Sequence, residues 1–223
     1  MLPLETLGRV RTADGKELVL YHRDGVFHIR IDGLELMSSR AHGSEEAMAR
    51  MVCGLLARVA GPRMLIGGLG LGYTLRAALD GLSADAEVVV AELFPAVVDW
   101  NRGPLAHLAG HPLKDSRVRV EATDVRDLLG RRSAAFDAIL LDVDNGPAAL
   151  TLTANQWLYT AAGLAAIRRS LKDPGILAVW SPSPDPAFVR RLRRAGFEVR
   201  SESVSARGEA SGPRHTIFLA TRV

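Results

Sequence analysis

The sequence predicts an α/β fold, with a mostly parallel sheet between helices and a small β-meander in front of it. From residue 63 onward, nearly continuous runs of Val, Ile and Leu alternate with helical patterns, which indicates parallel strands buried on both faces. The chain ends on two strand patterns, 197–207 and 214–223, with no helix between them, so the last strand should run antiparallel. Before residue 40, Asp-Gly pairs separate alternating apolar runs, which is a strong hairpin signal.

Three segments follow from these patterns. Residues 1–43 are expected to form the β-meander, with turns at the sequences ADG, RDG and DG. Residues 44–61 are expected to form a connecting helix, because apolar residues recur at helical spacing, Ser44 can cap the first turn and acidic residues follow it. Residues 62–223 are expected to form the α/β domain. Its strands are expected at 63–68, 87–93, 117–124, 136–144 and 175–182, and its helices at 73–82, 95–102, 125–129, 153–171 and 185–196.

Composition narrows the possible classes of protein. The chain has 223 residues with 28 Lys and Arg against 25 Asp and Glu, and its densest basic group, 188–196, has the spacing of a solvated helix face. We therefore expect no nucleic-acid partner. No apolar run is long enough to span a membrane, and no export leader is apparent, so we expect no membrane partner and a cytoplasmic protein. Cys53 stands alone, and the helical spacing of His107 and His111 is interrupted by glycine and proline, so we expect no metal site.

A glycine-rich turn follows the first strand of the α/β domain. It reads Gly68-Leu69-Gly70-Leu71-Gly72. The dinucleotide fingerprint would require a glycine where Tyr73 stands, and the Lys-Ser/Thr pair of a phosphate-binding P-loop is absent. The spacing suits close approach of the backbone to a nucleoside with a sulfonium tail, and it equally suits a tight strand-to-helix turn.

Acidic residues end the next two strands. Glu92 lies 20 residues after Gly72, where a carboxylate can accept hydrogen bonds from both hydroxyls of a ribose, or can be a solvated loop acid. Asp124 can accept a hydrogen bond from an adenine amino group, while the backbone amide near Val125 meets the ring edge. Asp124 can also cap the helix that follows, and the two roles are compatible.

The fourth strand delivers two acids in the sequence LLDVDNGP. On an extended backbone, Asp142 and Asp144 would point into one site, where they can bind a cationic amine and remove its proton. The alternative is a loop with an Asx turn that begins at Asp144 and continues through Asn145. Together, the four consecutive strand ends predict a site for an adenosyl-sulfonium ligand.

These motifs resemble those of spermidine synthases, the polyamine aminopropyltransferases. The resemblance covers most of the chain and is carried by IRIDGLELMSS, LIGGLGLGYTLRAAL, VVVAELFPAVVDWNR, DSRVRVEATDVRDLL and FDAILLDVDNGP. It implies a Rossmann-like class I methyltransferase fold, closed by a C-terminal antiparallel hairpin. It also implies polyamine biosynthesis: transfer of an aminopropyl group from decarboxylated S-adenosylmethionine to an amine, with release of methylthioadenosine.

The resemblance assigns roles to individual residues. It implies Glu92 as the ribose ligand, Asp124 as the adenine ligand and Asp142 as the catalytic, proton-accepting carboxylate. It also implies a homodimer. The remaining residues expected to bind the donor are Gly68, Leu69, Gly70, Gly72 and Val125, and those expected to bind the acceptor amine are Asp144 and Asn145.

The chain departs from the family at places that bind amines. The glycine turn lacks the acid that holds the aminopropyl ammonium, and Met48-Ala49-Arg50 stands where the family has Tyr-His-Glu. If Arg50 faced the pocket, it would repel a cationic amine. Two alternatives therefore stay open: methyl transfer from intact S-adenosylmethionine to a small molecule, and nucleoside binding without catalysis.

Five further residues lie near the expected cleft. His42 precedes the connecting helix, where the family places its substrate gate. Trp157 and Tyr159 follow the fourth strand of the domain, the one that carries Asp142. Trp180 and Ser181 end the fifth strand. Each can line the cleft, and each can instead belong to the core or the surface.

Overall fold

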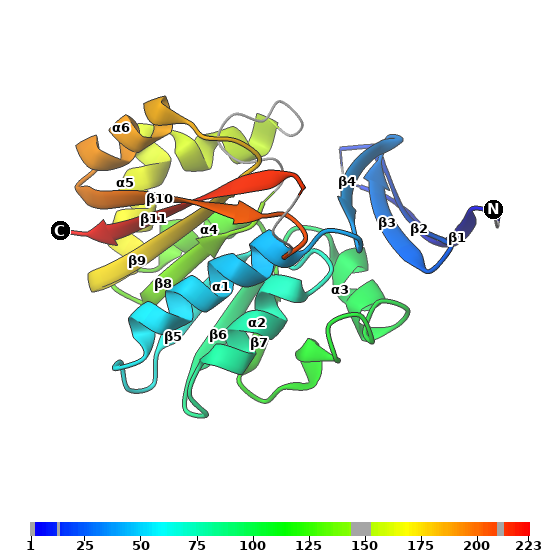
Figure 1. Cartoon of the computed structure of the whole chain (residues 1–223), viewed down its shortest axis with the longest axis horizontal. Helices are drawn as coiled ribbons and strands as arrows, with labels where there is room; N and C mark the ends of the chain where they lie inside the picture. Colours follow the sequence, from blue (N-terminus) through cyan, green and yellow to red (C-terminus); the bar gives the residue numbers. More distant parts are fainter. Residues whose placement is uncertain (1–2, 13, 144–152, 209–211) are drawn as a thin grey trace.

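A computed structural model describes residues 3–12, 14–143, 153–208 and 212–223 of the chain (Figure 1). Asp144 and Asn145, which were expected to bind the acceptor, lie outside these residues. No helix in the described ranges is long and apolar enough to cross a membrane.

The elements of the N-terminal part are β1 (Glu5–Arg11), β2 (Glu17–Arg23), β3 (Val26–Ile31), β4 (Leu34–Ser38) and α1 (Gly43–Leu56). Those of the α/β domain are β5 (Arg63–Gly67), α2 (Tyr73–Gly81), β6 (Glu87–Glu92), α3 (Pro95–Arg102), the 3-10 turn Pro112–Lys114, β7 (Val118–Ala122), α4 (Val125–Arg131), β8 (Phe136–Leu141), the 3-10 segment Thr153–Tyr159, α5 (Ala161–Ser170), β9 (Leu171–Ser181), α6 (Pro186–Arg194), β10 (Phe197–Ser205) and β11 (Arg214–Arg222).

The large sheet has the predicted topology. Its strand order is β10-β11-β9-β8-β5-β6-β7, and the five strands from β9 to β7 are parallel. β11 pairs antiparallel with both β9 and β10, which confirms the closing hairpin. Because β6 and β8 flank β5, the direction of winding reverses at β5, and ligands bind at the carboxyl ends of strands beside such a point.

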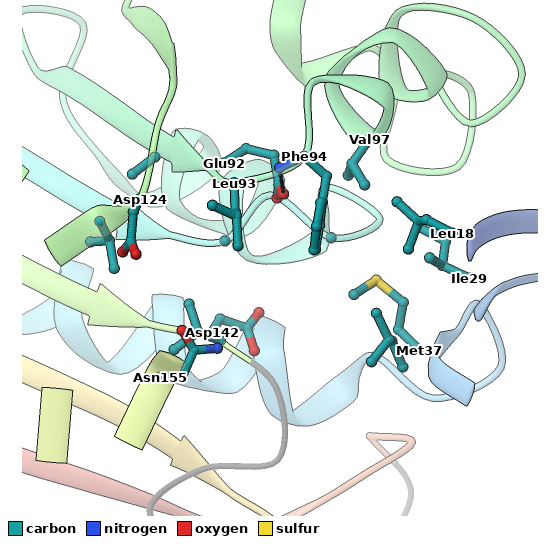
Figure 2. Close-up of a pocket in the computed structure, with 16 residues that line it drawn as sticks. Leu18, Ile29, Met37, Glu92, Leu93, Phe94, Val97, Asp124, Asp142 and Asn155 are labelled. Atoms are coloured by element: carbon teal, nitrogen blue, oxygen red, sulfur yellow. Dashed lines mark hydrogen bonds between the residues drawn. The ribbon is translucent and has the colours of Figure 1, made fainter. Parts of the chain in front are cut away.

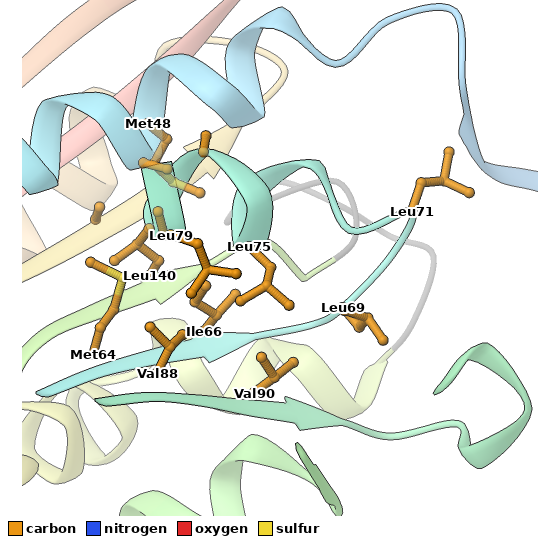
Figure 3. Close-up of a cluster of buried hydrophobic side chains, with 14 of the residues drawn as sticks. Met48, Met64, Ile66, Leu69, Leu71, Leu75, Leu79, Val88, Val90 and Leu140 are labelled. Carbon is orange, nitrogen blue, oxygen red and sulfur yellow. The ribbon is translucent and has the colours of Figure 1, made fainter. Parts of the chain in front are cut away.

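Alternation along the strands divides the core into two layers. On β5, Met64 and Ile66 point to the layer covered by α1, α2 and α3, whereas Leu65 points to the layer covered by α4, α5 and α6. All three side chains are almost completely buried, as expected for a parallel sheet with helices on both faces. Figure 3 shows the layer covered by α1, α2 and α3, in which Leu75 and Leu79 of α2 pack on the strands of the large sheet.

The N-terminal residues form the predicted β-meander. Strands β1 to β4 pair antiparallel in sequence order, and this sheet stands beside α3 in Figure 1. Two of its turns contain Asp-Gly pairs, Asp24-Gly25 and Asp32-Gly33, in which both residues have positive φ. That backbone matches the twist of a two-residue hairpin, so the Asp-Gly signal is confirmed.

Two helices differ from their predicted extents. α1 ends at Leu56 rather than 61, because Val59, the next apolar residue of the helical pattern, is exposed and would add little burial. The helix predicted over 153–171 is divided. Its first part is a 3-10 segment, and α5 starts afresh at Thr160, whose hydroxyl accepts a hydrogen bond from the Gly163 amide at 3.2 Å.

The N-terminal sheet packs on the α/β domain through a close contact at Gly8. A Cβ at this position would lie 2.3 Å from Nε1 of Trp100 on α3, so only glycine lets β1 approach the indole. The same sheet contributes Leu18, Ile29 and Met37 to the wall of the cleft described below. Docking at Gly8 therefore fixes one wall of the site.

We expect Gly8→Ala to lower the free energy of unfolding by roughly 1–3 kcal/mol, because overpacking would displace β1 or Trp100. Gly54→Ala is the matched control: a Cβ there meets nothing within 4 Å, and alanine should stabilise α1 by roughly 0.5–1 kcal/mol. Urea denaturation measures both values. Equal stability of the two variants would contradict the packing at Trp100.

Candidate active site

A cleft opens at the carboxyl ends of β5, β6, β7 and β8. Its volume is about 620 Å³ with the open mouth included, and we name it the first cleft (Figure 2). Apolar side chains from the N-terminal sheet and from Leu93 to Val97 form much of its wall. Asn155, which the sequence did not single out, also lines it. The candidate residues that line it are Gly68, Gly70, Glu92, Asp124, Val125 and Asp142.

The Glu92 side chain fastens two loops at the end of β6. It is only 6% exposed, its Oε2 accepts a hydrogen bond from the Leu69 amide at 2.8 Å, and its Oε1 accepts one from the Phe94 amide at 2.9 Å. The solvated-acid interpretation is therefore wrong. Each carboxylate oxygen has a second lone pair, which leaves Glu92 able to accept from hydroxyl groups in the cleft.

The glycine turn passes very close to the end of β8. At Gly68, φ is +88° and a Cβ would lie 2.6 Å from the Asp142 carbonyl oxygen, so a side chain is excluded there. Gly72 does not line the first cleft; it has φ +86° and stands at the start of α2. Leu69 is buried beneath the turn. The turn thus brings bare backbone to the cleft at Gly68 and Gly70.

Asp124 has the structural role that was considered for it. Its side chain caps α4 by accepting a hydrogen bond from the Arg126 amide at 2.8 Å. The carboxylate also lines the first cleft, near the backbone of Val125. Capping and ligand binding are therefore geometrically compatible at this residue.

Asp142 lies where two clefts meet. Its Oδ2 accepts a hydrogen bond from the Thr74 hydroxyl at 2.6 Å, and Thr74 is buried at the start of α2. A second cleft, of about 560 Å³ with its mouth, adjoins the first and shares Leu36, Met37, Gly70 and Asp142 with it. The Asp142 carboxylate is therefore accessible from both sides.

The second cleft is acidic. Besides Asp142 it is lined by Glu45, a residue that the sequence assigned only to the first turn of a helix. Within the described chain, no Lys, Arg or His lines this cleft. Burial, and then the nearby charge of Asp142, raises the pKa of Glu45 from its ordinary 4.5 to about 7. Adjacent helical residues point about 100° apart, and the sequence did not show which of the two glutamates would face the cleft.

Ser44 does not cap α1 as predicted. The residue at the cap position is His42, and no side chain bonds the first amides. Ser44 is completely buried, and its hydroxyl contacts Glu45, Trp180 and His215 instead. The physical reason is that α1 already starts at Gly43, so Ser44 lies within the first turn and its side chain is buried against the domain.

His42 and Arg50 line neither cleft. The His42 ring stacks on Tyr73 with 4.0 Å between centroids, and its Nδ1 lies 2.6 Å from Oε1 of Glu46. Arg50 is exposed and pairs with the same carboxylate at 3.0 Å. Arg50 therefore does not meet the condition under which it would repel a cationic amine in the pocket.

Four further candidates follow β8 or end β9, and of these only Trp180 lines a cleft. Trp157 packs on the core with Arg126 over its ring, and Tyr159 meets Phe188 edge to face. Ser181 is buried and donates a hydrogen bond to the Ser183 carbonyl. The described residues hold no group of three or more His, Cys, Asp or Glu suited to a metal.

The raised pKa of Glu45 predicts a pH-dependent stability. The folded state keeps the proton up to about pH 7, whereas the unfolded state loses it near 4.5, so ionisation costs stability as the pH rises through this interval. Relative to the parent protein, the free energy of unfolding of Glu45→Gln should rise by roughly 1–3 kcal/mol as the pH increases from 4 to 8. Urea denaturation at both pH values measures this gain. If the difference in unfolding free energy between the two proteins did not change over that pH range, the pKa of Glu45 would not be raised in the folded state.

Comparisons with known proteins bear on the fold. No protein-family profile and no curated protein sequence matches this sequence. Among similar solved structures, spermidine synthase from Thermotoga maritima has a TM-score of 0.76 and 18% identity, over 98% of this chain and 73% of that one. A spermidine synthase in complex with the transition state analogue AdoDATO has a TM-score of 0.75 and 16% identity, over 98% of this chain and 72% of that one. The chain therefore has a divergent spermidine synthase-like fold, with the class I methyltransferase arrangement and an added N-terminal sheet.

Proposed function

We propose that this protein transfers an aminopropyl group from decarboxylated S-adenosylmethionine to a small amine. The observation that carries the proposal is the pair of adjoining clefts that meet at Asp142. The first is lined by Glu92 and Asp124, the residues expected to bind a nucleoside, and the second has two carboxylates without a lining cation in the described chain. Two similar solved structures are spermidine synthases, one of them in complex with the transition state analogue AdoDATO, which supports decarboxylated S-adenosylmethionine as the donor.

The first cleft would hold the adenosyl part of the donor. Glu92 would accept hydrogen bonds from the ribose hydroxyls, and Asp124 would accept one from the adenine amino group. Apolar side chains such as Phe94 and Val97 offer faces for the ring (Figure 2). The bare backbone at Gly70 leaves room for the sulfonium tail to pass toward Asp142.

The acidic second cleft favours the decarboxylated donor. Intact S-adenosylmethionine would place its own carboxylate near Asp142 and Glu45, with no lining cation to offset the repulsion among the described residues. An aminopropyl ammonium would instead be attracted. The acid that the glycine turn lacks is thus replaced by Glu45, which comes from α1.

Asp142 would act as the base. It would take a proton from the acceptor ammonium, and the freed nitrogen lone pair would attack the methylene carbon beside the sulfonium. As the carbon–nitrogen bond forms, the carbon–sulfur bond breaks and its electron pair stays on sulfur. Neutral methylthioadenosine leaves, and the positive charge passes to the nitrogen. The hydrogen bond from Thr74 holds the Asp142 carboxylate in position for this step.

Other features of the proposal await separate tests. A homodimer is proposed from the resemblance, and the absence of nucleic-acid and membrane partners from the charge and apolar patterns. The cytoplasmic location likewise stays a prediction.

Product analysis tests the reaction. We expect methylthioadenosine by mass spectrometry when the protein is incubated with decarboxylated S-adenosylmethionine and an amine panel. Asp142→Asn should lower kcat by about 10²- to 10⁴-fold, because it removes the base. Asp99→Asn, which changes an exposed aspartate, is the matched control.

Other products would overturn the proposal. Release of S-adenosylhomocysteine from the intact donor would identify a methyltransferase. Binding of either donor without any turnover would favour a nucleoside-binding protein.

The role of Glu92 gives a second prediction. Glu92→Gln should weaken methylthioadenosine binding roughly 10- to 100-fold, because charge-assisted hydrogen bonds to the ribose become neutral ones. Isothermal titration calorimetry measures the dissociation constant. Glu198→Gln, an exposed change on β10, serves as control. An unchanged dissociation constant in a folded Glu92→Gln protein would remove Glu92 from the ligand site.

A further inference from the structure

Three side chains, two of them from segments distant in sequence, converge on the buried hydroxyl of Ser44. Its Oγ lies 2.5 Å from Oε2 of Glu45, 2.9 Å from Nδ1 of His215 on β11 and 3.0 Å from Nε1 of Trp180 on β9. Ser44 is completely buried, so these three groups are its surroundings rather than solvent. The proposed transfer reaction assigns no role to Ser44 or His215.

Counting protons shows that this network has two arrangements. A hydroxyl has one proton and two lone pairs, and the Trp180 N–H can only donate, so it occupies one lone pair. One proton and one lone pair remain for Glu45 and His215. When Glu45 is ionised, Ser44 donates to it and accepts from His215 Nδ1–H. When Glu45 is protonated, Ser44 accepts from it and donates to an unprotonated Nδ1.

The network connects the second cleft with a partly exposed ring. Glu45 lines the cleft, whereas His215 is half-buried near the end of the β10–β11 hairpin, edge-on to Trp180. Burial lowers the pKa of His215 below its ordinary 6.5, so the ring is neutral at pH 7 and able to accept a proton. An imidazolium formed there releases its proton readily.

We propose that Ser44 and His215 form a proton relay that carries the acceptor amine's proton from Glu45 to solvent. This inference rests on the proposed function, in which Asp142 takes the proton of the acceptor ammonium. Asp142 then gives that proton to the Glu45 carboxylate, which lines the same cleft, and Asp142 becomes a carboxylate again. Protonated Glu45 passes its proton to Ser44 Oγ, and Ser44 passes its own proton to His215 Nδ1. His215 then releases the proton on Nε2 to solvent. Glu45 is again a carboxylate, and exchange with water resets the tautomer of His215.

Several charged or titratable groups surround Glu45. Asp142 at the end of β8 and Glu46 on α1 both raise its pKa by repulsion, and Tyr73 at the start of α2 lies within range of both glutamates. The hydrogen bond from Ser44 acts in the opposite direction. Variants at Ser44 or His215 leave these neighbours in place.

Activity as a function of pH tests the relay. His215→Gln and Ser44→Ala should each lower kcat by about tenfold at pH 7, with KM within about twofold, because proton release becomes slow. The defect should shrink toward pH 9, where more of the acceptor arrives neutral. Added imidazole should restore part of the activity of His215→Ala. His107→Gln, an exposed histidine change, is the control.

A purely structural role would give a different result. The loss would then be equal at all pH values, and imidazole would not restore activity. That outcome would overturn the relay.

A measurement without turnover separates the relay from the reaction. Nitrogen-15 NMR of the His215 ring should show a tautomer change near pH 7 that follows Glu45, and both Ser44→Ala and Glu45→Gln should abolish it. An unchanged His215 titration in Glu45→Gln would overturn the relay even if aminopropyl transfer were observed. The tautomer change without turnover of either donor would overturn the proposed function and support the Ser44 network.

Discussion

The carboxylate of Glu92 is the constraint on which the shape of the site depends. A buried carboxylate is costly unless hydrogen-bonded, and here the Leu69 and Phe94 amides provide those bonds. The glycine turn after β5 and the loop after β6 must therefore both approach the end of β6. Asn101 adds a tie from α3 by donating to the Gly70 carbonyl at 2.8 Å. The backbone of the glycine turn is thus held from two sides.

The acidic residues of the second cleft destabilise the folded protein. Glu45 and Asp142 repel each other in a partly buried place with no lining cation among the described residues, which is a cost that other side chains would avoid. A bound ammonium would offset this repulsion, because its positive charge attracts both carboxylates. It would lower the pKa of Glu45, and binding it would stabilise the folded protein. Such destabilised, paired acids are typical of sites that bind or deprotonate cations.

Sequence patterns were informative where structure depends on local repeats, and less so where distant segments meet. The parallel sheet, the closing hairpin and the Asp-Gly turns follow from periodicity and turn chemistry. The strand-end positions of Glu92, Asp124 and Asp142 follow from topology, because parallel strands end at one edge. Glu45 was missed, because only packing decides which acid of a helix's first turn faces inward. Ser44 was assigned to a cap, because its partners on β9 and β11 lie far away in sequence.

Two opposing effects act on Glu45, and their magnitudes decide its state. It lies in the first turn of α1, where the helix dipole favours the carboxylate by roughly 0.3–1 kcal/mol. A pKa rise from 4.5 to about 7 corresponds to about 3 kcal/mol in the other direction, so burial and Asp142 prevail. The carboxyl therefore changes charge near neutral pH, close to the point at which a small opposing charge can switch it. In the proposed reaction an arriving ammonium would supply that charge, and the Ser44 hydroxyl, which caps no helix, would adjust its hydrogen bond to Glu45.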